Sequence, residues 1–85
     1  MASRIPNLEF DGEEIKRRDV RTMMKEVGVS FSNEDEFTVT IGDSVHTIER
    51  DAFKMCFGLS KVQFGNSVQK IGRQAFMSCN SKEIF

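Results

Sequence analysis

The sequence predicts a small α+β fold in which an N-terminal amphipathic helix caps a short solenoid of about two coils with parallel short strands. Three observations carry this prediction. The C-terminal half repeats itself with a 23-residue period. The segment before the repeat has the apolar spacing and the end residues of a helix. The chain of 85 residues, 39% hydrophobic and 29% charged, has the length and composition of a single compact domain.

Residues 1–35 are expected to form an N-terminal helical cap, with a helix from about residue 12 to residue 27. Asp11 is a preferred N-cap residue, and Gly28 suits the left-handed position after a helix. Four apolar residues at helical spacing would share one face: Val20, Met23, Met24 and Val27. We also expect short strands over residues 8–10 and 29–31, and a loop over residues 32–36.

Residues 36–85 contain two copies of the 23-residue repeat. When residues 39–56 are aligned with residues 62–79, nine of the eighteen pairs are identical. The identical pairs are Val39/Val62, Gly42/Gly65, Ser44/Ser67, Val45/Val68, Ile48/Ile71, Arg50/Arg73, Ala52/Ala75, Phe53/Phe76 and Cys56/Cys79. Average residue usage would give about one such pair by chance. The two copies are therefore expected to fold alike and to stack on one another.

Each copy has the pattern of one coil. Apolar residues alternate with polar ones as in a strand with one buried face, and a Gly-Asp-Ser or Gly-Asn-Ser turn follows. The segment Ala-Phe-x-x-Cys is expected to form a helical turn. Parallel stacking would then place Phe53 against Phe76 and Cys56 against Cys79. Both cysteines are expected to be buried and reduced, with a disulfide between them as the alternative.

A longer motif extends this pattern from the first copy into the second. It reads Ile-x-x-x-Ala-Phe-x-x-Cys-x-x-Leu-x-x-Val-x-Phe from Ile48 to Phe64, and it resembles the BspA-like (treponemal-type) leucine-rich repeat. The resemblance covers about residues 36–85. It implies a leucine-rich-repeat-like solenoid and a role in binding, because proteins of this family are usually long arrays that bind other proteins, often at cell surfaces. Glu36 and Lys82 stand where the pattern has Leu.

The sequence therefore predicts a non-catalytic protein–protein interaction module and not an enzyme. No catalytic, metal or cofactor site is expected, because one His and two Cys cannot supply a four-ligand metal site and no nucleophile has a recognisable base beside it. The partner-binding residues are expected on the outward side of the strands and at an open C-terminal edge: Thr38, Thr40, Lys61, Gln63, Phe76, Met77, Ile84 and Phe85. They would hold a protein partner or a second copy of the chain, which makes an oligomer the expected state.

Charge is unevenly distributed along the chain. Residues 31–52 carry six acids and one base, a net charge of −5, whereas residues 53–85 carry five bases and one acid, a net charge of +4. Head-to-tail association and solvated faces of opposite sign both fit this pattern. Residues 1–30 carry six acids and six bases, which argues against nucleic acid as a partner.

Two alternatives stay open. The chain could be a small inhibitor or accessory subunit, for example one encoded by a mobile element, that occludes a site on a larger protein. It could also be a fragment of a longer repeat array. No apolar run has the roughly 20 residues of a membrane span, and the first residues lack the apolar core of a secretory signal. No membrane contact is expected, and the compartment stays undetermined with the cytoplasm slightly favoured.

Overall fold

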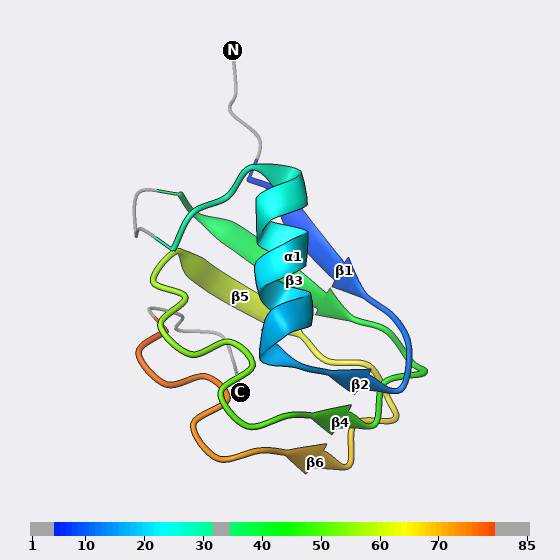
Figure 1. Ribbon diagram of the computed structural model, residues 1–85. Helices are drawn as coiled ribbons and strands as arrows, with labels where there is room; N and C mark the ends of the chain where they lie inside the picture. Colours follow the sequence, from blue (N-terminus) through cyan, green and yellow to red (C-terminus); the bar gives the residue numbers. More distant parts are fainter. Residues whose placement is uncertain (1–4, 32–34, 80–85) are drawn as a thin grey trace.

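The computed structural model describes residues 5–31 and 35–79. In this part the chain passes three times through two short parallel sheets, and each pass adds one strand to each sheet (Figure 1). The first sheet contains β1 (Asn7–Phe10), β3 (Phe37–Ile41) and β5 (Leu59–Gln63), in the order β1-β3-β5. The second contains β2 (Glu14–Ile15), β4 (Thr47–Ile48) and β6 (Lys70–Ile71), in the order β2-β4-β6. A mixed helix-and-strand fold with parallel strands, as predicted, is confirmed.

The register of the strands follows the 23-residue repeat. Val39 pairs with Val62 in the first sheet, and Ile48 pairs with Ile71 in the second. Both pairs are identities of the sequence alignment. The register shifts near the start of β3, where Phe37 pairs with Leu59 and the next residue, Thr38, pairs with Lys61. The two copies therefore stack in parallel, as the sequence predicts.

Residues 7–15 form a first pass that precedes the two copies. Leu8 pairs with Val39 in the first sheet, and Ile15 pairs with Ile48 in the second. The strand predicted over residues 8–10 is confirmed as β1, whereas β2 lies where the predicted helix was expected to begin. Ile15 is 1% exposed, so its burial between the sheets takes this residue away from the helix.

The single helix of the described residues, α1 (Arg17–Val27), begins later than predicted. It starts at Arg17 and not near residue 12, and Asp11 is not its N-cap. Asp19 instead accepts the backbone N–H of Lys16 at 3.0 Å and so satisfies one of the free donors at this end. The C-terminal prediction is confirmed, because Gly28 follows the helix in the left-handed region with φ of 86° and donates to the Met24 carbonyl.

The helix buries a narrower face than the sequence predicts. Val20 and Met24 are buried and Met23 is partly buried, but Val27 at the end of the helix is 44% exposed. The strand predicted over residues 29–31 is absent, since these residues form a loop in which Val29 is buried. Among the described residues, no helix has the length and apolar character needed to cross a membrane.

The core lies between the two sheets and is centred on Phe53. The Phe53 ring is fully buried and stacks on Phe76, with ring centroids 5.2 Å apart and planes 2° from parallel. Phe10 of the first pass meets the same ring edge-on at 5.6 Å. In the part of the chain that the structure describes, no polar or charged residue is buried, so apolar contact in this core adds to the backbone hydrogen bonds between the three passes. The predicted stacking of Phe53 on Phe76 is confirmed.

In the second and third passes, the segment after the strand of the second sheet forms a third side, beside the two sheets. This side consists of turns, and the helical turn predicted for it is absent. Asp51 and Met55 have φ of 63° and 62°, and Gln74 and Ser78, at the same positions of the next copy, have φ of 60° and 63°. Backbone bonds run between passes here, from Phe53 N–H to the Ala75 carbonyl at 2.7 Å, for example. Because these N–H groups of the second pass bond to the third, they cannot make the i to i−4 bonds of an α-helix.

Candidate interaction surfaces

The outward face of the first sheet carries six polar side chains in two rows. Asn7, Thr38 and Lys61 lie in register across the three strands, and so do Glu9, Thr40 and Gln63. They alternate with buried apolar residues of the same strands, because successive side chains of a strand point to opposite faces. The structure thus brings together the four strand residues that the sequence predicts for partner binding. We name these six residues the sheet face.

Hydrogen bonds hold part of the sheet face in place. The hydroxyl groups of Thr38 and Thr40 both donate to Asn7 Oδ1, at 2.7 and 3.2 Å. Sequence reasoning missed Asn7 and Glu9, because it assigned the first pass to a cap and not to the sheet. The alternation of Asn7 and Glu9 with Leu8 and Phe10 was the signal that could have identified them.

Of the four residues predicted for the open C-terminal edge, the structure describes Phe76 and Met77. Phe76 is only partly exposed, because it stacks on Phe53 and meets Phe64 edge-on with ring centroids 6.0 Å apart. Met77 is 47% exposed. Ile84 and Phe85 lie outside the described residues. The third pass is nevertheless less covered than the second, since Ile71 is 40% exposed whereas its counterpart Ile48 is fully buried.

On the side of the second pass away from the third, the first pass contacts it through the side chain of Arg17. Its Nη1 donates to the carbonyl oxygens of Asp51 at 3.0 Å and Lys54 at 2.9 Å, and its guanidinium lies 5.8 Å from the centre of the Phe31 ring. One pass later, the carbonyl of Met77, the counterpart of Lys54 in the next copy, accepts the N–H of Met55 at 2.7 Å. Arg17 therefore supplies from α1 a donor that a backbone N–H supplies between the later passes.

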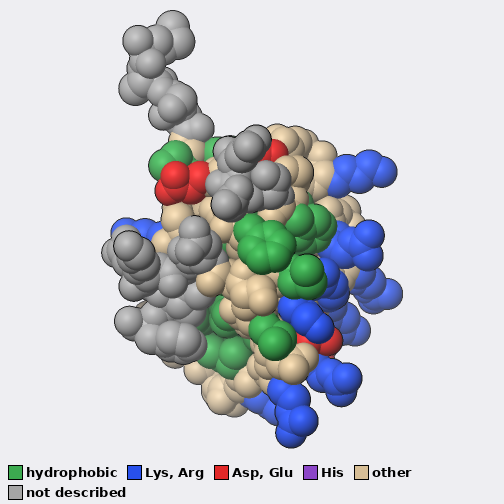
Figure 2. All heavy atoms as spheres, turned by 90° about the vertical axis from the view of Figure 1, so that its left-hand side faces the viewer, with side chains coloured by type: hydrophobic (Ala, Val, Ile, Leu, Met, Phe, Trp, Pro, Cys, Tyr) green, Lys and Arg blue, Asp and Glu red, His purple; other side chains and the backbone are tan. Residues whose placement is uncertain are grey.

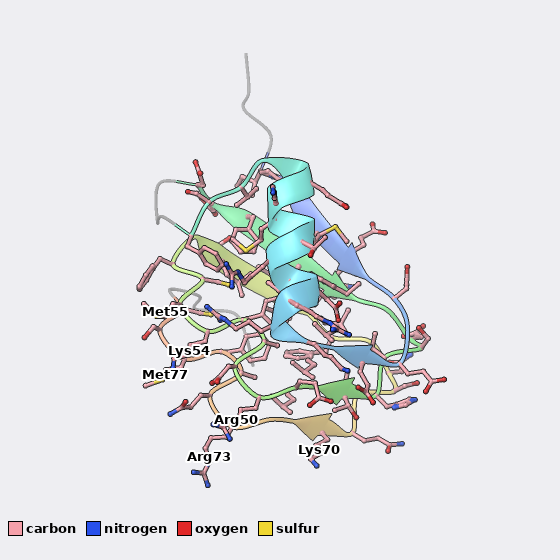
Figure 3. The ribbon with its side chains drawn as sticks, viewed as in Figure 1. Arg50, Lys54, Met55, Lys70, Arg73 and Met77 are labelled. Atoms are coloured by element: carbon pink, nitrogen blue, oxygen red, sulfur yellow. The ribbon has the colours of Figure 1, made fainter. Side chains whose placement is uncertain are left out.

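The turn side of the second and third passes, together with the adjoining strand β6, presents bases and methionines, all exposed except the half-buried Lys54. Arg50, Lys54 and Met55 come from the second pass and its flank, and Lys70, Arg73 and Met77 come from the third (Figure 3). We name these six residues the methionine face. Sequence reasoning did not single them out as a surface, although the excess of bases in residues 53–85 was a signal for it.

The two thiols are neighbours on adjacent passes, as predicted. Both are free, Cys56 is fully buried, and Cys79 is partly buried with its Sγ 3.0 Å from the Phe53 carbonyl oxygen. The hydrogen bond between the two side chains, with burial, raises the pKa of Cys56. The same hydrogen bond lowers the pKa of Cys79 against the opposing effect of burial. Cys79 is thus the thiol that ionises first.

His46 lies on the side of the molecule opposite the two thiols, at the turns that connect the first sheet to the second. Its side chain is 44% exposed and its Nε2 lies 3.9 Å from a carboxylate oxygen of Glu13. This agrees with the surface position that its alignment with Gln69 predicts. Within residues 5–31 and 35–79, no cluster of three or more His, Cys, Asp or Glu side chains is arranged to hold a metal ion.

Two open grooves flank α1. One, of about 520 Å³, has a basic rim and an apolar floor and is lined by Arg18, Arg21, Thr22, Met24, Lys25, Val29 and Phe31. The other, of about 280 Å³, is acidic and is lined by Glu9, Phe10, Asp11, Asp19, Thr22, Met23 and Glu26. The two sides of the helix therefore present opposite charge.

Comparison with known proteins extends the sequence resemblance towards the N-terminus. The family model described as "BspA type Leucine rich repeat region (6 copies)" matches residues 5–85. This match includes the first pass, which the predicted span of residues 36–85 left out. No curated protein and no solved structure matches the chain.

Proposed function

The chain belongs to the BspA-type leucine-rich repeat family, and from this membership we propose that it is a non-catalytic module that binds another protein. The observation that carries the proposal is the sheet face. Six polar side chains from three parallel strands lie in register on one surface, two from each strand. Such a surface offers hydrogen-bonding groups at fixed spacing on a rigid support, which suits specific contact with a protein partner.

We further propose that the three passes are coils of a short solenoid and that α1 caps its first coil. Terminal repeats need a cap, because a repeat that lacks a neighbour exposes apolar surface and free backbone groups. Arg17 supports this role, since it donates from α1 to the Lys54 carbonyl of the second coil, where turns of the first coil would otherwise donate. The partly uncovered Ile71 and Met77 make the third coil less protected than the second.

Affinity capture from native host extract tests the proposed binding surface. The chain is compared with two variants that make the same chemical change, Gln63→Arg on the sheet face and Gln69→Arg in the connection between β5 and β6, both at exposed positions. We expect Gln63→Arg to lose a stoichiometric partner that Gln69→Arg keeps. A partner retained equally by both variants would contradict the proposal. A single captured enzyme that loses activity on binding would favour the inhibitor alternative.

We also expect the chain to self-associate through the third coil, which is less protected than the second. Sedimentation at roughly tens of micromolar would show a dimer or larger species, because the third coil exposes the apolar side chains of Ile71 and Met77. A stable monomer at this concentration would contradict the predicted oligomer. It would leave the sheet-face proposal standing, since that surface lies on another side of the coils.

A further inference from the structure

We propose that the methionine face binds an acidic, partly apolar segment of a partner protein. This inference goes beyond the sheet face, because it concerns different residues on another side of the molecule. Its starting point is the combination of charge and apolar exposure in one place. The bases of the face are Arg50, Lys54, Lys70 and Arg73, and its apolar members are Met55 and Met77.

Backbone bonds between the passes bring these side chains onto one surface. Asp51 N–H donates to the Arg73 carbonyl at 3.2 Å, and Met55 N–H donates to the Met77 carbonyl at 2.7 Å. Residues between them point inward, since Ala52 and Ala75 are buried. Figure 3 shows Met55 and Met77 projecting to the same side from neighbouring passes, with Arg50 and Arg73 close together below them. The face is therefore fixed by the same contacts that stack the two passes.

The methionines are exposed although the chain has a core that could hold them. Met55 and Met77 are 44% and 47% exposed, and Phe57, close to Met55 in sequence, is 39% exposed. Met24, by contrast, is almost fully buried. Exposed methionines adapt their shape to apolar partner groups, and they are enriched in the centres of protein interfaces. The apolar part of the face thus favours a partner segment with aliphatic or aromatic side chains.

Positive charge borders the exposed apolar side chains on this side of the molecule. Figure 2 shows exposed hydrophobic side chains on this side, with Lys and Arg side chains to the right of them and below them. The acids next in sequence to Arg50 are Glu49 and Asp51, and Asp51 Oδ2 lies 3.8 Å from Arg50 Nε, so it offsets part of one charge. Four bases against these two acids leave a net charge of +2, and charge of this sign attracts an acidic segment.

Acidic side chains lie mainly elsewhere in the described part. Asp11, Glu13 and Asp43 are exposed at the turns that join the first sheet to the second, on the side away from the methionine face (Figure 1). An acidic segment would therefore be repelled from that side and attracted to this one. Nucleic acid would use the bases but would gain little from two exposed thioethers, because phosphate contacts need charge and hydrogen bonds. The observations thus favour a protein segment.

Fluorescence anisotropy with a defined probe tests this inference on the whole chain. The probe is a labelled peptide of repeated Asp-Leu-Glu-Glu-Leu units, and a peptide with Ser in place of Leu measures the apolar part. We expect Arg73→Glu to weaken binding of the first peptide by roughly fivefold to tenfold and Met77→Ser by roughly threefold. Lys61→Glu, which makes a matched charge change on the sheet face, should alter binding by less than about twofold.

Several results would overturn the inference. Equal weakening by Lys61→Glu and Arg73→Glu would show that only overall charge matters. Equal binding of the Leu and Ser peptides would remove the role of the methionines. Tighter binding of a DNA duplex or of anionic phosphatidylserine vesicles than of the Leu peptide would assign the face to a different ligand. Circular dichroism of each variant confirms that it is folded, and Gln63→Arg should leave peptide binding unchanged, which separates this test from that of the sheet face.

Discussion

Replacement of Arg17 by Ala should destabilise the protein more than any other single change at an exposed or half-buried base. The side chain donates two hydrogen bonds from a charged group to backbone carbonyls, at 2.9 and 3.0 Å. Hydrogen bonds of charged groups contribute about 1.5–3 kcal/mol each. Because Arg17 is only half-buried, the lower end of this range applies, and the pair should contribute about 3 kcal/mol.

The position of Arg17 in the helix works in the opposite direction. It is the first residue of α1, where a positive charge faces the positive end of the helix dipole. This unfavourable interaction is worth about 0.3–1 kcal/mol, and the Ala variant relieves it. The expected net loss of unfolding free energy is therefore about 2–3 kcal/mol, to which lost contact with the Phe31 ring could add a few tenths. A total stability of about 4–13 kcal/mol makes this a large share.

Urea unfolding followed by far-ultraviolet circular dichroism measures the effect. With a slope of about 1–1.5 kcal/mol per molar urea, the midpoint should fall by about 2 M. Arg18→Ala is the matched control, because Arg18 carries the same charge in the same helical turn and is exposed. It should change the unfolding free energy by no more than about 0.5 kcal/mol. If Arg17→Ala and Arg18→Ala had the same midpoint, Arg17 would not replace a donor that turns of the first coil would otherwise supply.

Three further predictions concern the backbone and the thiols. Gly72→Ala should cost about 1–3 kcal/mol in urea unfolding, because a Cβ at Gly72 would collide with the backbone of Arg50; a cost below about 0.5 kcal/mol would contradict this close approach. Met55→Val should lower the free energy of unfolding by about 1–3 kcal/mol, whereas Met55→Asn should leave it near the parent value, because Asn tolerates the left-handed region and Val does not. Equal stability of the two variants would refute the positive φ of Met55. Iodoacetamide should modify Cys79 before Cys56 and at a lower pH than it modifies an ordinary thiol, because the lowered pKa of Cys79 leaves more thiolate at any given pH. Mass spectrometry that finds Cys56 modified first would contradict this order.

The stacked passes could be predicted because their contacts repeat in the sequence. Val39 over Val62 and Phe53 over Phe76 are identities at one fixed spacing, and parallel stacking places identical residues on each other. The outward positions Thr38 and Lys61 followed from simple alternation along the strands. Both kinds of inference need only the period of the repeat and the period of a strand.

The first pass was missed because it does not keep that spacing. From Ile15 to Val39 there are 39 − 15 = 24 positions, whereas from Ile48 to Val62 there are 62 − 48 = 14. The longer segment contains the 11 residues of α1, which takes the place of the turns in the later passes. An alignment of the sequence with itself at the 23-residue period could not detect a pass of different length. The family model, which matches residues 5–85, did include it.

Local signals also misplaced the start of the helix. Asp11 has the chemistry of an N-cap, but pairing of Ile15 with Ile48 outweighs it, since burial of an Ile side chain is worth about 1.5–3 kcal/mol and an N-cap about 1 kcal/mol. The role of Arg17 had no sequence signal at all, because its acceptors are backbone carbonyls that every residue carries. The methionine face was equally hidden, since its members become neighbours only when the second and third passes stack.

The central place of β3 sets the order in which the molecule can come apart. β1 and β5 each pair with β3 and not with each other. Loss of the third pass would therefore leave β1 paired with β3, whereas loss of the second pass would separate the two that remain. Amide hydrogen exchange should accordingly be slowest in β3 and faster in β5 and β6, since opening from an end requires fewer contacts to break. In kinetic terms, the contacts of β5 and β6 would open before those of β3, and the resistance of this part of the chain to proteases would depend on how firmly β5 is held against β3.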